Sequence, residues 1–309
     1  MPIKDIAFVR YQATDLDRME SFLVDFGLHR AHRTPEALYM RAHDASPFVH
    51  VTELGSNNQT LGFGLQTSSE SDLHEIAAHV GSVVSDNPEP GGGLRVRFSD
   101  PNGFLVDALW GQAQGTALPA RQPIAMNPAV GRQRMGRTVR LSAKPCEVAR
   151  IGHAALFVSD FRRSYDFYTR VLGFKPSDTY WAQEESNVVA AFMHCGLGQQ
   201  WTDHHTIALI TARDGRARFA HTAFEVLDLD DLAQGSKYLT SKGHRHSWGI
   251  GRHIQGSQLF DYWIDPFGNK IEHWTDGDLV NDDTPVGHAK VGADELSQWS
   301  PPMPEDFLK

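Results

Sequence analysis

The chain has 309 residues, 40% of them hydrophobic, and a formal net charge of -9. This length and composition predict about two globular domains with real cores and exclude a chain that is disordered throughout. Nonspecific nucleic-acid binding needs a surplus of Lys and Arg, so the acidic balance argues against it and favours a small organic partner. Cys146 and Cys195 are too few and too isolated for a disulfide framework or a thiolate zinc site.

The sequence has no recognisable targeting or membrane segment. It begins MPIKDIAFVRYQ, without a basic segment followed by an apolar run, and no stretch approaches the length that spans a bilayer. We therefore expect no membrane partner and a soluble, cytoplasmic protein with reduced thiols.

The first half of the chain contains two strand and helix pairs. A predicted strand over residues 6–12 leads into a helix that begins after Thr14-Asp15, has apolar residues at helical spacing, and ends at Gly27. A second strand, residues 61–67, precedes the helical pattern of residues 71–81. The half ends at residues 95–110 in two strands joined by an Asp-Pro-x-Gly turn, in which Pro fixes φ and Gly allows the tight reversal.

Glycine and proline interrupt every regular period between Gly111 and Pro145, which predicts a linker over residues 112–148. This segment carries six Arg and Lys residues and no acidic residue between Gln112 and Cys146. No aromatic residues alternate with these charges, so we expect them to pair with the acidic domains rather than to bind a nucleic acid.

The second half repeats the pattern of the first. The strand at residues 151–158 leads through Ser159-Asp160 into a helix with apolar spacing up to Leu172 and a stop at Gly173. The strand at residues 221–228 precedes the helical pattern of residues 230–243, and residues 260–274 contain the same turn between two strands. The halves therefore predict an α+β fold of four βαβββ units, two per half. We divide the chain into residues 1–111, the linker 112–148, residues 149–276 and a C-terminal tail, 277–309.

Two histidines and a glutamate in the second half suggest a metal site. His153, His221 and Glu272 make up the two-histidine, one-carboxylate set that is typical of non-haem iron or manganese oxygenases, because it leaves positions open for substrate and dioxygen. They are far apart in the sequence, so only the fold can bring them together. Each lies on a predicted strand at a position that strand periodicity allows to face a common concave surface.

The first half lacks these ligand types. Matching the helix starts puts Phe8 opposite His153, and matching the turns puts Asp107 opposite Glu272. Matching residues 61–65 with 222–226 puts Thr60 opposite His221. Phe and Thr cannot replace two imidazoles, so we expect the first half to be a scaffold without a metal site.

The closing segment of the second half resembles a family signature. The signature consists of a small residue, a histidine, a tyrosine, an Asp-Pro-x-Gly turn and a glutamate. In this chain its members are Gly251, His253, Tyr262, Asp265, Pro266, Gly268 and Glu272. Together with the paired βαβββ units it resembles the type I extradiol catechol dioxygenases of the vicinal oxygen chelate superfamily, of the 2,3-dihydroxybiphenyl 1,2-dioxygenase type. One departure is Asp261, where the family usually has an aliphatic residue.

The resemblance implies roles for particular residues. It implies that His153, His221 and Glu272 bind Fe(II), with Mn(II) as the other metal that fits them. The string HHTIAL (204–209) is similar to the family's HHTLAL, whose second histidine is the acid-base group, here His205; the alternative is His204. His253 and Tyr262 match groups that hydrogen-bond the substrate hydroxyls.

The resemblance also implies a reaction, the insertion of both atoms of O2 into a catechol-type substrate beside its two hydroxyls. One alternative is a glyoxalase-type metal-dependent isomerase, which usually takes a glutamate-richer ligand set from both modules. The other is a metal-free binding or sequestration protein, a class that typically lacks the triad.

The pocket and the tail are less determined by the sequence. Phe192, Trp248 and Ile250 are candidates to line an aromatic-sized pocket, although an apolar core also explains them. Asp261 either faces solvent or alters the surroundings of Tyr262. We expect a homo-oligomer, with the tail wrapped on a surface or on a neighbouring subunit.

Overall fold

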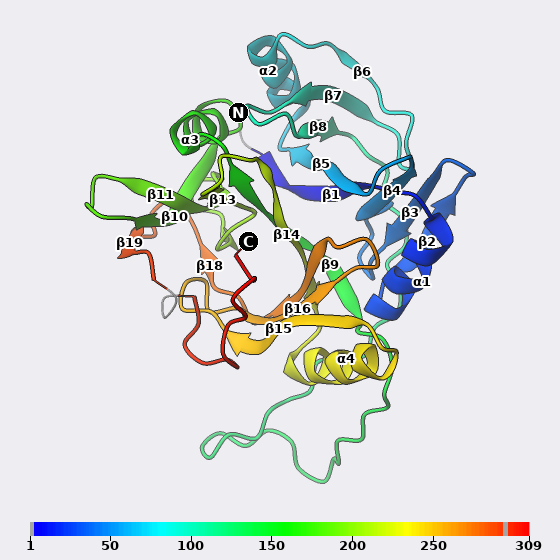
Figure 1. Ribbon diagram of the computed structural model, residues 1–309. Coiled ribbons are helices and arrows are strands. Elements are labelled where there is room, and N and C mark those ends of the chain that lie inside the picture. The colour runs from blue at the N-terminus through cyan, green and yellow to red at the C-terminus, as the bar shows by residue number, and fades with distance from the viewer. Residues whose placement is uncertain (1–2, 293–295, 309) are drawn as a thin grey trace.

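The computed structural model describes residues 3–292 and 296–308, and it contains two large β-sheets and four helices (Figure 1). The first sheet has the strand order β2-β3-β4-β1-β5-β8-β7-β6. Its elements are β1 (Ile3–Ala13), α1 (Leu16–Phe26), β2 (His29–Arg33), β3 (Ala37–Arg41), β4 (His50–Leu54), β5 (Gln59–Thr67), α2 (Glu70–Val80), β6 (Val84–Asp86), β7 (Leu94–Ser99) and β8 (Leu105–Trp110).

The second sheet repeats this arrangement, in the order β15-β16-β17-β14-β9-β13-β11-β10-β19. Figure 1 shows it curving around the C-terminal end of the chain. Its elements are β9 (Val148–Val158), α3 (Phe161–Arg170), β10 (Phe174–Trp181), β11 (Val188–Cys195), β13 (Ile207–Thr211), β14 (Arg218–Val226), α4 (Leu229–Ser241), β15 (Arg245–Arg252), β16 (Leu259–Ile264), β17 (Lys270–Thr275) and β19 (Gly287–Lys290).

In each sheet two βαβββ units join along their first strands. The central pairs, β1 with β5 and β9 with β14, are antiparallel. Each central strand has a parallel neighbour on its other side, β4 and β8 in the first sheet and β13 and β17 in the second. The predicted α+β fold with four repeated units is therefore confirmed.

The helices begin where the sequence places their caps. Asp15 and Asp160 have extended backbones, and each side chain accepts a hydrogen bond from the third residue of its helix. Helix α1 ends at Gly27, whose φ of 114° strongly favours glycine. Helix α3 ends at Arg170, slightly before the predicted end at Leu172, although Leu172 is still buried in the core.

The two halves pack against each other through buried contacts. The hydroxyl of Tyr11 on β1 lies 2.7 Å from the hydroxyl of Thr222 on β14, and both groups are buried. His273 on β17 donates from Nε2 to the carbonyl of Phe26 and stacks on its ring at 3.7 Å between centroids. One continuous set of buried hydrophobic residues extends across both halves.

The linker has no regular structure, and the tail adds two short strands to the second half. No helix or strand is assigned between Trp110 and Val148, and the basic Arg121 forms an ion pair with Asp228, the N-cap residue of α4. In the tail, β18 (Leu279–Val280) pairs with β12 (Thr202–Asp203), and β19 adds to the edge of the second sheet beside β10. Within residues 3–292 and 296–308, no helix has both the length and the apolar character needed to cross a bilayer.

Candidate metal centre

The structure brings the three predicted ligands together on adjacent strands of the second sheet. His153 lies on β9, His221 on β14 and Glu272 on β17. The Nε2 atoms of the two histidines are 3.2 Å apart, and each is 3.2 Å from Oε2 of Glu272. Among the described residues, this is the one group of His, Cys, Asp or Glu side chains whose ligand atoms converge closely enough to hold a metal ion.

The donor set and its spacing fit a divalent transition metal. Ligand atoms about 2.1 Å from one ion and at right angles to each other are about 3 Å apart, close to the observed separation. Glu272 is fully buried, and neither carboxylate oxygen has a hydrogen-bond partner among the described residues. An unpaired buried carboxylate is costly, so this site is suited to a cation. Burial and the neighbouring His153 hold the pKa of His221 well below its usual range, which keeps its imidazole neutral and able to bind a metal.

His205 lies directly beside this group. It precedes β13, and its ring centroid is 4.1 Å from that of His153. Burial, with His153 as the next cause, holds the pKa of His205 well below its usual range. The side chain is therefore a neutral imidazole that lines the cavity, whereas His204, the alternative acid-base residue, is not among the lining residues.

His253 and Tyr262 form a hydrogen-bonded pair on the other side of the ligands. His253 donates from Nδ1 to the carbonyl of Leu296 in the tail, so its Nε2 carries a lone pair. The Tyr262 hydroxyl, 3.0 Å away, then donates to that nitrogen. Tyr262 pairs with Glu272 across the ladder, and burial together with the Glu272 charge raises the pKa of the phenol well above its usual range.

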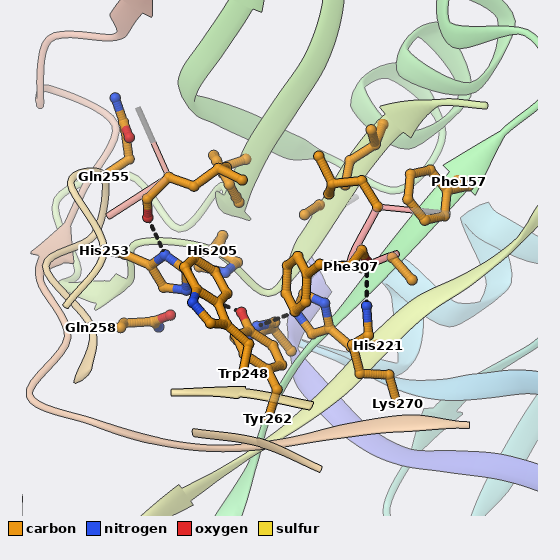
Figure 2. A pocket seen from close by; sticks show the side chains of 18 of the residues that line it. Phe157, His205, His221, Trp248, His253, Gln255, Gln258, Tyr262, Lys270 and Phe307 are labelled. Carbon is orange, nitrogen blue, oxygen red and sulfur yellow. Dashed lines mark hydrogen bonds between the residues drawn. The ribbon is translucent and has the colours of Figure 1, made fainter. Parts of the chain in front are cut away.

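The cavity beside these residues is mainly apolar (Figure 2). Figure 2 shows His253 and two glutamines on one side and Phe157 with Lys270 on the other. Lys270 is the one Lys or Arg among the described lining residues, and burial lowers its pKa to about 8. Its ammonium donates to the carbonyl of Phe307, which belongs to the tail.

Some of these residues were not expected from the sequence. Lys270, Gln255 and Gln258 line the cavity, as do Leu296, Phe307 and Leu308 of the tail. For Lys270 a signal was present, because it lies two residues before Glu272 and shares its face of the strand. The tail residues carry no comparable signal, since their positions depend on a tertiary path through an irregular segment.

The structure bears on two points about the cavity wall that the sequence left open. Phe192 and Trp248 line the cavity, but Ile250 is not among the lining residues. Asp261 neither faces solvent nor touches the cavity. It is fully buried, and its carboxylate accepts hydrogen bonds from His246 and from the Trp263 indole. Alternation along β16 explains this, because Tyr262 faces the cavity and its neighbour must face the opposite way.

The predicted counterpart of His221 was wrong. In the second sheet, Ala223 of β14 lies opposite His153 and Glu272 in the strand ladders. In the first sheet, Gly64 of β5 lies opposite Phe8 and Asp107. His221 lies two residues before Ala223, and Gly62 lies two residues before Gly64. Gly62, and not Thr60, therefore corresponds to His221. A Cβ on Gly62 would lie 1.7 Å from a backbone oxygen, so this position accepts no side chain.

Comparison with known proteins shows similarity in sequence and fold to one superfamily. Residues 150–273 match the Glyoxalase/Bleomycin resistance protein/Dioxygenase superfamily. The chain is 32% identical to Metapyrocatechase 2 of Cupriavidus necator, over 96% of this chain and 89% of that protein. It is 24% identical to the Iron-dependent extradiol dioxygenase of Rhodococcus jostii, over 97% of each. The Mn(II)-bound glyoxalase of Novosphingobium aromaticivorans shares the fold, with a TM-score of 0.80, 24% identity, and coverage of 96% of this chain and 91% of that one.

Proposed function

The chain belongs to the extradiol ring-cleaving dioxygenases of the Glyoxalase/Bleomycin resistance protein/Dioxygenase superfamily, and on this premise we propose that it opens a catechol-type ring at an Fe(II) ion. We assign the metal ligands to His153, His221 and Glu272, and place the active site in residues 149–276 with the tail across it. The substrates are then a catechol-type molecule and O2.

The observation that carries this proposal is the geometry of the three ligands. Two imidazoles and one carboxylate converge, with equal separations of 3.2 Å between their ligand atoms, and the carboxylate belongs to a fully buried glutamate. This ligand set suits Fe(II), and Mn(II) fits it as well. A bound ferrous ion supplies positive charge that favours an ionised catechol oxygen, and open positions for substrate and dioxygen.

The surrounding residues fit the handling of a catechol. His205 is a neutral base beside the ligands, so it can accept a proton from a substrate hydroxyl and later return it. Tyr262 and His253 form an ordered pair that orients the substrate oxygens. The aromatic rings of Phe192 and Trp248 supply an apolar wall that excludes water and accepts a flat ring.

A colour assay tests the proposal. Protein purified anaerobically, loaded with ferrous iron and exposed to air with 3-methylcatechol or 2,3-dihydroxybiphenyl should form a yellow ring-opened product. The control is the same protein without added iron, which should remain colourless. One iron bound per chain with no yellow product across a panel of catechols would contradict the proposed reaction and favour an isomerase. Failure to bind any metal would contradict the ligand assignment.

A further inference from the structure

A second histidine and an aspartate extend behind His205, away from the cavity. The Nδ1 atoms of His205 and His204 are 3.1 Å apart, and Nε2 of His204 is 2.5 Å from Oδ2 of Asp178 on β10. Both histidines are buried, whereas the Asp178 side chain is 18% exposed. These three side chains therefore form a continuous hydrogen-bonded row from the cavity wall towards the surface.

We propose that Asp178 and His204 are positioning residues that fix His205 in one tautomer. A carboxylate can only accept, so His204 donates its Nε2 proton to Asp178. A neutral His204 then has a lone pair on Nδ1, and His205 must donate its own Nδ1 proton to it. The remaining nitrogen of His205, Nε2, carries a lone pair for the cavity, which is the form that a general base needs.

The surrounding backbone confines this row. The Ser177 hydroxyl donates to the His204 carbonyl at 2.6 Å, which fixes the backbone from the β10 side. Gly256 lies against the His204 ring, where a Cβ would come within 2.9 Å of Nδ1. Gly287 of β19 lies against Asp178, where a Cβ would be 1.7 Å from Oδ1. The Ser177 hydrogen bond thus holds the row in place, and the two glycines leave no room for a side chain against it.

The opposite tautomer of His205, with its proton on Nε2, requires His204 to carry an additional proton. If His204 carried protons on both nitrogens, it would donate to Asp178 and to His205 at once, and His205 would present an N–H to the cavity. The inference rests on the proposed function for its importance in catalysis, but the tautomer of His205 can be measured without turnover.

Asp178→Asn is the central test. The introduced amide can donate to Nε2 of His204, which moves the His204 proton to Nδ1 and reverses the bond to His205. Changing a residue that orients a catalytic group typically costs about 10- to 100-fold, so we expect a loss of this size in kcat with unchanged KM and iron content. The matched control is Asp25→Asn, because Asp25 also pairs with a histidine, His244, at 2.9 Å, and neither residue lines the cavity. It should leave kcat unchanged.

Variants of His204 add a rescue test. The amide oxygen introduced by His204→Asn lies near the original Nδ1 position and can accept from His205, whereas His204→Leu offers no acceptor. We expect His204→Asn to retain more of the wild-type kcat than His204→Leu at equal iron content. Equal losses in the two variants would indicate a packing role and overturn the inference.

The tautomer itself is read from long-range proton–nitrogen correlation spectra of full-length protein carrying isotopically labelled histidine. Zn(II) replaces iron in this experiment because it is diamagnetic, and His205→Gln assigns the signal. We expect the His205 proton on Nδ1 in the wild type and on Nε2 in Asp178→Asn. A proton on Nε2 in the wild type overturns the inference. If the wild type shows Nδ1 protonation but cleaves no catechol, the proposed function fails while the positioning role stands.

Discussion

Each sheet has a buried carboxylate at the same position, and the surroundings of that carboxylate differ between the two sheets. At one corresponding position, the second sheet has Glu272 and the first has Asp107, both almost completely buried. In the second sheet the carboxylate faces two imidazoles, and no Lys or Arg among the described residues pairs with it. In the first sheet Arg10 and Arg97 pair with Asp107 at 3.0 and 2.6 Å. One half therefore neutralises its buried acid with arginine, and the other half is left able to bind a metal.

The residues next to these acids complete the contrast. The strand ladders place Arg10 in the first sheet where the second sheet has Ala155, which lines the cavity. The small side chain leaves open the space that a guanidinium fills in the first half. The difference teaches that one fold can carry a salt-bridged core in one half and a cavity in the other when the side chains at corresponding positions differ.

The pair of neighbouring rings that includes His153 in the second sheet corresponds to a pair of rings in the first sheet. His153 and His205 lie 4.1 Å apart between centroids, and Phe8 and Phe48 lie 4.7 Å apart at the equivalent place. Backbone hydrogen bonds support the match, because Thr206 and Val49, which follow the second ring in each half, accept equivalent bonds from β9 and β1. The packing is conserved between the halves while the chemistry has changed from apolar to basic.

The largest expected effect comes from removing the metal-binding charge. Glu272→Gln replaces the only carboxylate of the triad with a neutral amide, so iron retention and turnover should both be lost. Metal analysis of protein loaded anaerobically and then desalted measures this directly. Asp107→Asn is the matched control, since it makes the same change in the first sheet and should keep a full complement of iron. Full iron retention by Glu272→Gln would show that this carboxylate is not needed to hold the metal, and would contradict the contrast between Glu272 and Asp107.

Removing His205 should separate metal binding from catalysis. We expect His205→Ala to retain iron and to lose about 10²- to 10⁴-fold in kcat, the usual contribution of a positioned acid-base group. Steady-state kinetics at matched iron content measures the loss. The control is Phe48→Leu at the corresponding place in the first sheet, which should change stability without changing kcat. Normal turnover by the His205 variant would show that another group moves the proton.

Asp107 of the first sheet should contribute to the free energy of unfolding rather than to metal binding. Asp107→Asn removes a carboxylate that the buried Arg10 and the partly exposed Arg97 share. Breaking a buried pair costs about 3 kcal/mol or more, a figure that applies to Arg10 and not to Arg97. Arg10 keeps its contact with Glu89 at 2.8 Å, which argues for the lower part of that range. Urea unfolding of the wild type and the variant measures the difference. An unchanged unfolding free energy would mean that the arginines do not stabilise the first half.

Repetition within the sequence made much of this structure predictable. Helix caps such as Asp15 and Gly27 and the two Asp-Pro-x-Gly turns are local signals, so the four units could be read without tertiary information. Strand alternation also allowed His153, His221 and Glu272 to face a common surface, but their convergence depends on strand order, which the sequence pattern does not give. The alignment of Thr60 with His221 was wrong by two residues. A shift of two residues along a strand keeps the same face, so the alternation of side chains between the two faces does not reveal the error. Asp178 was missed because its partner His204 is reached only across neighbouring strands.

The smallest expected effect concerns a buried histidine of the first sheet, which lies outside the candidate site. His50 on β4 is fully buried, and burial lowers its pKa from 6.5 to about 3. Well above pH 6.5 both the folded and the unfolded state hold it neutral, so it adds no pH dependence there. As the pH falls towards 3 the unfolded state binds a proton that the folded state rejects, and stability falls by up to about 1.4 kcal/mol per unit. Between pH 7 and 5 the wild type should therefore lose about 2 kcal/mol more than His50→Gln. Urea unfolding at the two pH values measures this, with the exposed His74→Gln as control; equal losses in all three proteins would show that His50 does not titrate in this way.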